Sequence, residues 1–145
     1  MSAGAARGVA PEGAAMEFPH ALQQALGFVR VLEHGADPGH AQLEFDGRPE
    51  FAHTGATIMQ GGILIAWLDH AMAWAVAARE PRAVLASLEI KASYLGPTPP
   101  GLSIAEARVV QWGRSIVFLE ATLRAPGGQA RVRASSTGRL ILPKG

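Results

Sequence analysis

Residues 61–80 read GGILIAWLDHAMAWAVAARE, and this stretch decides the fold class. Beyond its two leading glycines it holds no Gly or Pro and is apolar on nearly every side, which is typical of a helix buried inside a protein. The run is also about long enough to cross a bilayer. However, Asp69 and His70 stand at its centre, where a charge in lipid is costly. The sequence therefore predicts a long buried helix rather than a membrane span.

Strands separated by short turns occupy most of the remaining chain. A short helix over 18–26 precedes two of them, and four more follow Pro81. The six predicted strands cover residues 28–33, 41–45, 82–95, 102–112, 115–124 and 129–142. Successive strands joined by short turns pair antiparallel. The predicted fold is therefore α+β, with a long central helix wrapped by a six-stranded antiparallel sheet.

The strand over 82–95 alternates regularly, so it also predicts which side chains share a face. One face is expected to carry Val84, Ala86, Leu88, Ile90, Ala92 and Tyr94. The opposite face then carries the polar side chains, Ser87 and Glu89 among them.

Composition excludes several classes of function. The 145 residues include 13 Lys plus Arg and 12 Asp plus Glu, for a formal charge of +1, which argues against a nucleic-acid-binding protein. There is no cysteine, which excludes a disulfide scaffold, a Cys-ligated zinc site and a thiol nucleophile. No histidine pair has metal-ligand spacing, so neither a metal nor another cofactor is expected.

The first 17 residues are rich in Ala, Gly and Pro and show neither periodicity nor the apolar run of a signal peptide. We expect residues 1–17 to form a disordered tail and residues 18–145 to form a single domain. A cytoplasmic location is expected, because a reducing compartment fits a chain without cysteine.

Asp69 is the first candidate for chemistry. Helical spacing places it on an apolar face with Gly62, Ile65, Ala66, Ala73 and Val76. A carboxylate in such surroundings is costly unless it is paired or functional. Both explanations remain open on the pattern alone, although small neighbours leave room for a ligand.

Gln60, Gly61 and Gly62 form the second candidate, at the start of the long helix. The first N–H groups of a helix have no intrahelical acceptor and lie at its positive end, where they suit an oxyanion or a polarised carbonyl oxygen. A simple tight turn is the alternative. Asp69 lies about 12 Å further along the same helix axis. The two features can therefore share a reacting atom only if two copies of the helix run antiparallel in a dimer.

Four further polar residues have candidate roles. His53 and Thr54, in the irregular segment before the helix, are placed to orient substrate or water, although an exposed loop histidine is the plain alternative. Ser87 lacks a G-x-S-x-G turn or an adjacent base, so we expect at most a polar pocket contact. Arg114 is a basic turn position that could meet a phosphate-bearing ligand. His70 is expected to pack in the core or at a dimer interface.

The stretch from Gln60 to Asp69 resembles the H/Q-G-G-x-x-x-x-x-x-D signature of hotdog-fold thioesterases, particularly the PaaI-like branch. Residues 87–97 and 109–121 are similar to the strands that follow the helix in that family, and the resemblance covers about residues 18–142. It implies the same fold, a long helix wrapped by an antiparallel sheet. Gln60 stands where this branch often has His, and Gln cannot shuttle a proton near neutral pH.

The resemblance implies hydrolysis of acyl-CoA thioesters at sites shared between the subunits of a homodimer, and such dimers commonly pair into tetramers. Asp69 would act as general base or nucleophile, and the N–H groups of Gly61 and Gly62 would polarise the thioester carbonyl. The small apolar face with Ile65, Ala66 and Ala73 favours an aromatic or medium-chain acyl group. Two alternatives stay open: a catalytically silent hotdog protein that binds an acyl ligand or a partner, and a hydratase of the same fold.

Overall fold

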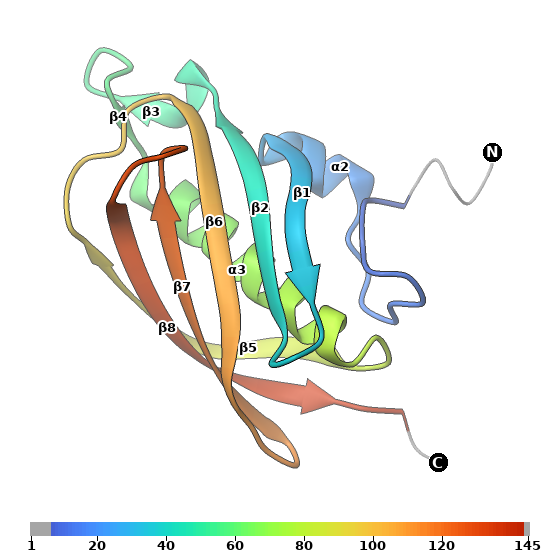
Figure 1. Cartoon of the computed structure of the whole chain (residues 1–145). Helices are drawn as coiled ribbons and strands as arrows, with labels where there is room; N and C mark the ends of the chain where they lie inside the picture. Colours follow the sequence, from blue (N-terminus) through green and yellow to red (C-terminus); the bar gives the residue numbers. More distant parts are fainter. Residues whose placement is uncertain (1–6, 144–145) are drawn as a thin grey trace.

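The computed structural model describes residues 7–143, and its centre is one six-stranded antiparallel sheet (Figure 1). The strands lie in the order β1-β2-β6-β7-β8-β5. Their bounds are Phe28–Gly35 (β1), His40–Gly47 (β2), Val84–Tyr94 (β5), Gly101–Trp112 (β6), Ile116–Arg124 (β7) and Ala130–Ile141 (β8). The predicted α+β class, the six strands of the main sheet and their antiparallel pairing are confirmed.

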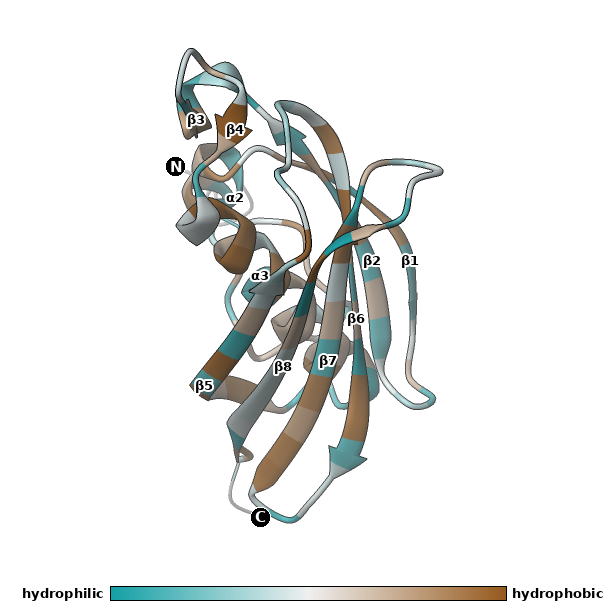
Figure 2. Ribbon diagram, turned by 90° about the vertical axis from the view of Figure 1, so that its left-hand side faces the viewer, coloured by the Kyte–Doolittle hydropathy of each residue, from teal (hydrophilic) through white to brown (hydrophobic). Residues whose placement is uncertain are grey.

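Helix α3, Gly61–Arg79, lies against one face of this sheet, and Figure 2 shows the strands curving around it. Its large side chains are almost completely buried there, including Trp67, Leu68 and Met72. The helix is long and apolar enough to span a membrane by length and composition, but it packs as the core helix of a globular domain. Alternate strand residues such as Leu119 and Leu123 supply the facing side of the core.

The segment before α3 carries more regular structure than the sequence indicated. A 3₁₀ turn, η1 (Pro49–Phe51), leads into β3 (Ala52–His53), which pairs with β4 (Ile58–Met59). The Gln60 N–H donates to the carbonyl of Phe51, and the Met59 N–H donates to the carbonyl of Thr98. These bonds fix the start of α3 beside the β5–β6 connection.

The face assignment on β5 is wrong for the first part of the strand. A register shift between Ser87 and Glu89 in the pairing with β8 marks a β-bulge. Because a bulge inserts one extra residue, the alternation of side chains between the two faces of the strand is reversed from one side of the bulge to the other. Before the bulge, Leu85 and Ser87 face the helix, and Leu88 is 61% exposed instead of buried. After it, Ile90 and Ala92 pack against the core as predicted.

The prediction of a disordered tail is wrong for residues 7–17. Val9 exchanges two hydrogen bonds with the Gln23 side chain of helix α2 (His20–Ala25), at 2.7 and 2.9 Å. The Ala15 N–H donates to the carbonyl of Pro81 at 2.7 Å. This segment is therefore tied to the domain at both of its ends, while residues 1–6 lie outside the described part of the chain.

His70 lies in the core, as the sequence predicted. It packs edge-on against Phe18 and Phe45, and its Nε2 is 3.0 Å from the Gln23 amide nitrogen. Burial disfavours the charged imidazolium and lowers the pKa of His70 to about 4. The ring is therefore neutral at pH 7.

This shift predicts a pH-dependent stability. Between pH 6.5 and about 4 the unfolded state binds a proton at His70 and the folded state does not, so the free energy of unfolding falls as pH is lowered through this window. The loss should reach on the order of 3 kcal/mol. Urea unfolding at fixed protein concentration checks it. The His70→Gln variant should lack this part of the pH dependence, and an unchanged profile in that variant would contradict the assignment.

Candidate active site

Asp69 lies in the middle of α3, half-buried, where it accepts a hydrogen bond from the Ser87 hydroxyl at 2.7 Å. The β5 bulge directly after Ser87 is what allows this strand to direct a hydroxyl toward the helix. Sequence reasoning selected Ser87 only as a pocket contact. The structure makes it the group that orients the Asp69 carboxylate, and a hydrogen bond to a charged acceptor is among the stronger ones.

Asp69 also lines a pocket of about 270 Å³ between α3 and the N-terminal part of the chain. Ala66, Ala73 and His70 contribute the other α3 positions of this pocket. The opposite wall comes from the N-terminal part of the chain: Met16, Glu17, Phe18, Leu22 and Leu26. The helical periodicity therefore predicted Ala66 and Ala73 correctly as neighbours of Asp69. Ile65 is half-buried and does not line this pocket, and Val76 is fully buried in the core.

The start of α3 is organised by Gln60. Its side-chain oxygen accepts from the Ile63 N–H at 3.1 Å, so Gln60 is the N-cap of the helix. This cap uses the third N–H of the helix and leaves those of Gly61 and Gly62 for an external acceptor at the positive end of the helix dipole. A Cβ on Gly62 would lie 2.9 Å from the Gln60 side-chain oxygen, so any other residue there would push against the group that caps the helix.

Tyr94 is a candidate site residue that sequence reasoning missed. Its hydroxyl donates to the carbonyl of Gly61 at 2.8 Å, and a Cβ on Gly61 would lie 3.0 Å from the same hydroxyl oxygen. Partial burial raises the pKa of Tyr94, so the phenol keeps its proton and remains a donor. The Gly61 carbonyl belongs to the same peptide plane as the Gly62 N–H. Tyr94 therefore fixes the direction in which that N–H points.

His53, the last residue of β3, and Thr54, in the β3–β4 turn, are both exposed, and the two side chains bond each other at 2.8 Å. Thr54 and Ala56 both have a positive φ, 56° and 58°, on either side of Gly55. Left-handed backbone at residues other than glycine is strained and is concentrated at functional sites. The turn is thus held in one shape, with the imidazole exposed.

Arg114 lies on the β6–β7 turn, at the end of the sheet opposite the start of α3. The helix C-terminus marks that end, because the Arg79 guanidinium sits 4.7 Å from the centre of the Trp112 ring. Within one chain, Arg114 is therefore remote from the Gly61–Gly62 amides. Asp69 is also separated from those amides, by about 12 Å of helix axis.

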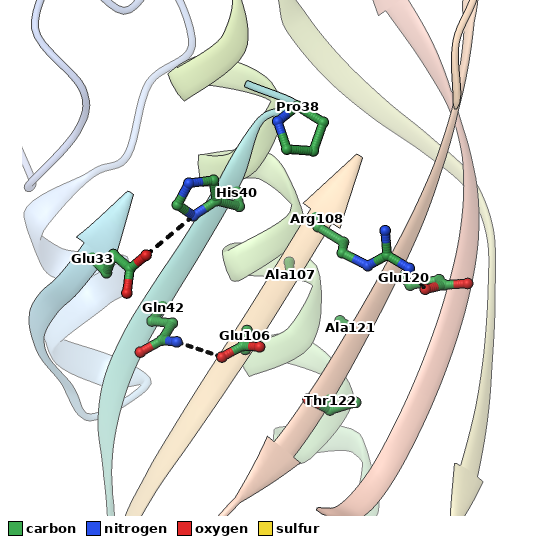
Figure 3. A pocket seen from close by; sticks show the side chains of 10 residues that line it. All are labelled: Glu33, Pro38, His40, Gln42, Glu106, Ala107, Arg108, Glu120, Ala121 and Thr122. Carbon is green, nitrogen blue, oxygen red and sulfur yellow. Dashed lines mark hydrogen bonds and ion pairs between the residues drawn. The ribbon is translucent and has the colours of Figure 1, made fainter. Parts of the chain in front are cut away.

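A different pocket lies on the outer face of the sheet, and Figure 3 shows it with α3 behind the strands. Polar side chains in its walls are paired with one another, Gln42 with Glu106 and Arg108 with Glu120. None of the predicted site residues lines it. Within residues 7–143 there is no cluster of three His, Asp or Glu side chains that could hold a metal ion.

Comparison with known proteins decides the family. The model of the thioesterase superfamily matches residues 56–131, which include Gly61, Asp69, Ser87 and Tyr94. The chain belongs to the thioesterase superfamily. A relative from Saccharolobus solfataricus, named as a candidate esterase, is 22% identical over 83% of this chain and 78% of its own length. These matches support thioester hydrolysis in general.

Solved structures of the family share the fold. A candidate thioesterase of Ralstonia eutropha JMP134, described as related to phenylacetic acid degradation, is 27% identical with a TM-score of 0.74, over 82% of this chain and 89% of that one. A variant of the phenylacetic acid degradation protein PaaI from Thermus thermophilus is 23% identical with a TM-score of 0.71, over 82% of this chain and 97% of that one. The resemblance to PaaI-like hotdog thioesterases is confirmed.

Removing the Tyr94 hydroxyl tests its part in a thioesterase site. Tyr94→Phe keeps the ring beside Gly61 and loses a hydrogen bond worth about 0.5–1.5 kcal/mol, so kcat should fall roughly two- to tenfold at unchanged KM. Steady-state kinetics on one thioester measures both constants. Ser93→Ala, a change at the exposed neighbouring residue, is the matched control and should match the wild type. A raised KM with unchanged kcat would show instead that Tyr94 binds substrate.

Proposed function

We propose that this protein hydrolyses acyl-CoA thioesters with an aromatic or medium-chain acyl group. The observation that carries the proposal is the Asp69 carboxylate, oriented by Ser87 on an otherwise apolar helix face and opening into a pocket of about 270 Å³. A carboxylate is costly in such a place unless it has a partner or a function, and Ser87 alone neutralises none of its charge. The family match supports the reaction type.

The proposed chemistry needs only water and the groups described. Asp69 takes a proton from water as the water oxygen bonds to the thioester carbonyl carbon. The N–H groups of Gly61 and Gly62 stabilise the resulting oxyanion. Collapse of this intermediate breaks the C–S bond, and the proton held by Asp69 passes to the departing thiolate. The products are a carboxylic acid and free CoA.

A homodimer completes the site in this proposal. Strand β5 is the last strand of the sheet and pairs only with β8 among the described strands, so its other edge is available to a second copy. Exposed edges of this kind are normally covered or paired. Pairing two β5 edges about a two-fold axis runs the two α3 helices antiparallel. Asp69 of one subunit then approaches Gly61 of the partner subunit.

The substrate side of the proposal follows from the pocket walls. Ala66, Ala73, Leu22 and Leu26 are apolar, and Glu17 would repel an acyl group that ends in a carboxylate. We assign the CoA phosphates to the protein surface, with Arg114 as the candidate basic contact. His53 and Thr54 are proposed to orient substrate or water from the β3–β4 turn.

The test is release of free thiol from a panel of acyl-CoA thioesters. We expect turnover of phenylacetyl- and hexanoyl-CoA and little of malonyl- or succinyl-CoA. A preference for the dicarboxylic substrates would overturn the apolar-pocket assignment. Binding of acyl-CoA with no thiol release would instead favour a catalytically silent hotdog protein.

A further inference from the structure

The N-terminal residues 7–19, here called the strap, are held on the domain by individual hydrogen bonds rather than by a helix or a long strand. The Trp74 indole N–H, on α3, donates to the carbonyl of Val9 at 3.2 Å. The same carbonyl accepts from Gln23, whose amide nitrogen also contacts His70. The strap is thus tied through Val9 to two helices, one of which carries Asp69.

The strap separates two hollows. One is the pocket of about 270 Å³ that contains Asp69, and the other, of about 700 Å³, is lined by the strap itself. Three consecutive residues line both hollows: Met16, Glu17 and Phe18. These residues therefore form the partition between the Asp69 pocket and the larger space behind it.

The three partition residues differ in how firmly they are held. Phe18 is buried and packs against the rings of His70 and Trp74, with centroids 5.2 and 6.3 Å away. Glu17 is exposed. Met16 is half-buried, and its unbranched side chain fills irregular space without a fixed rotamer. Met16 packs against the edge of the core but, unlike Phe18, is not itself buried in it, so it is the partition residue whose size can be changed with the least effect on the core.

We propose that the strap sets the upper size limit of the acyl group, with Met16 as the specificity-determining residue. This inference rests on the proposed thioesterase function, because the acyl group must enter the pocket that contains Asp69. Pockets for small molecules usually measure about 300–1,000 Å³, so 270 Å³ suits one ring or a medium chain. Opening the partition would add the second hollow and admit long chains.

The test compares Met16→Ala, Met16→Trp and the wild type on hexanoyl-, decanoyl- and palmitoyl-CoA. Met16→Ala should raise the palmitoyl-to-hexanoyl ratio of kcat/KM at least about tenfold, because pocket contacts discriminate by this much or more per methylene. Met16→Trp should lower the decanoyl-to-hexanoyl ratio. Glu12→Ala is the matched control, since Glu12 is an exposed strap residue that lines neither hollow. Ratios that stay unchanged in both Met16 variants overturn the proposal.

A second variant displaces the strap from a residue that does not itself line the Asp69 pocket. A Cβ on Gly8 would collide with the carbonyl of Phe18 and the side chain of Gln23, so Gly8→Ala must displace the strap. It should broaden the acyl range as Met16→Ala does. A folded Gly8→Ala protein with the wild-type range would argue against a strap-defined limit.

Binding separates failure of this inference from failure of the proposed function. Non-hydrolysable alkyl-CoA thioethers of the same three chain lengths are titrated calorimetrically into each protein. If no thioester is hydrolysed but thioether affinity follows the Met16 variants, the strap proposal stands and the thioesterase proposal fails. If thioesters are hydrolysed with no dependence on Met16, the strap proposal fails alone. If no protein binds or hydrolyses any of these compounds, both are overturned.

Discussion

Asp69→Asn is expected to lower kcat by about 10²–10⁴, the usual loss when a general base is removed. Asparagine has the same shape as aspartate and can still accept the hydrogen bond of Ser87, so the geometry of the helix is preserved. It cannot take a proton from water. Because the acyl pocket keeps its walls, KM should change far less than kcat. Thiol release from phenylacetyl-CoA, measured at saturating substrate, gives the comparison.

Two further variants make this result specific. Asp37→Asn, in the exposed β1–β2 turn, is the matched control and should keep the wild-type rate. Ser87→Ala leaves the carboxylate in place without its donor, and its loss should be smaller than that of Asp69→Asn, on the order of tenfold. Wild-type turnover by Asp69→Asn would exclude the proposed mechanism.

The fold could be predicted because apolar residues recur clearly both at helical spacing and at the two-residue spacing of strands. Residues 61–80 form an apolar run of helical length, and the predicted strands are separated by turns that contain Gly or Pro. Few arrangements of these elements are possible other than a helix wrapped by a sheet. The same helical period predicted Ala66 and Ala73 as neighbours of Asp69. These features are local, so one sequence is enough to find them.

The β5 bulge could not be predicted in this way. Residues 86–94 alternate without interruption, and no Gly or Pro marks an irregularity at Ser87 or Leu88. The shift is imposed by β8, where Ser87 pairs with Gly138 and Glu89 with Thr137. The bulge has two consequences: the Ser87 hydroxyl donates to Asp69, and Leu88 is exposed. Both depend on how β8 pairs with β5 and not on the sequence of β5 itself.

The strap and Tyr94 were missed for the same physical reason. The order of the strap comes from Val9 contacting Gln23 and Trp74, residues 14 and 65 positions away. Its composition alone resembles that of a disordered segment. Tyr94 bonds a carbonyl 33 residues away. The available signal was weak: Tyr94 is the only tyrosine of the chain, on a strand expected to lie against the helix.

Mixed dimers of two inactive variants should regain activity if the site is shared between subunits. Asp69→Asn removes the base, and Gly61→Val displaces Tyr94 and the first amides of α3, because a Cβ there meets the Tyr94 hydroxyl at 3.0 Å. Each homodimer carries the same lesion in both of its sites. In a heterodimer, one site collects both lesions and the other has Asp69 and Gly61 intact.

The heterodimer should therefore reach about half of the wild-type activity per dimer, starting from two nearly inactive proteins. Two different affinity tags allow the mixed species to be purified after co-expression, and thiol release is then compared with that of the two homodimers. Should Asp69 and Gly61 instead act within one chain, every chain of the heterodimer would carry a lesion, and the purified mixture would stay inactive. Because about 12 Å of helix axis separates the two residues within one chain, a site that uses both of them predicts rescue. An active monomer in light scattering at the assay concentration would refute the shared site independently of any mutation.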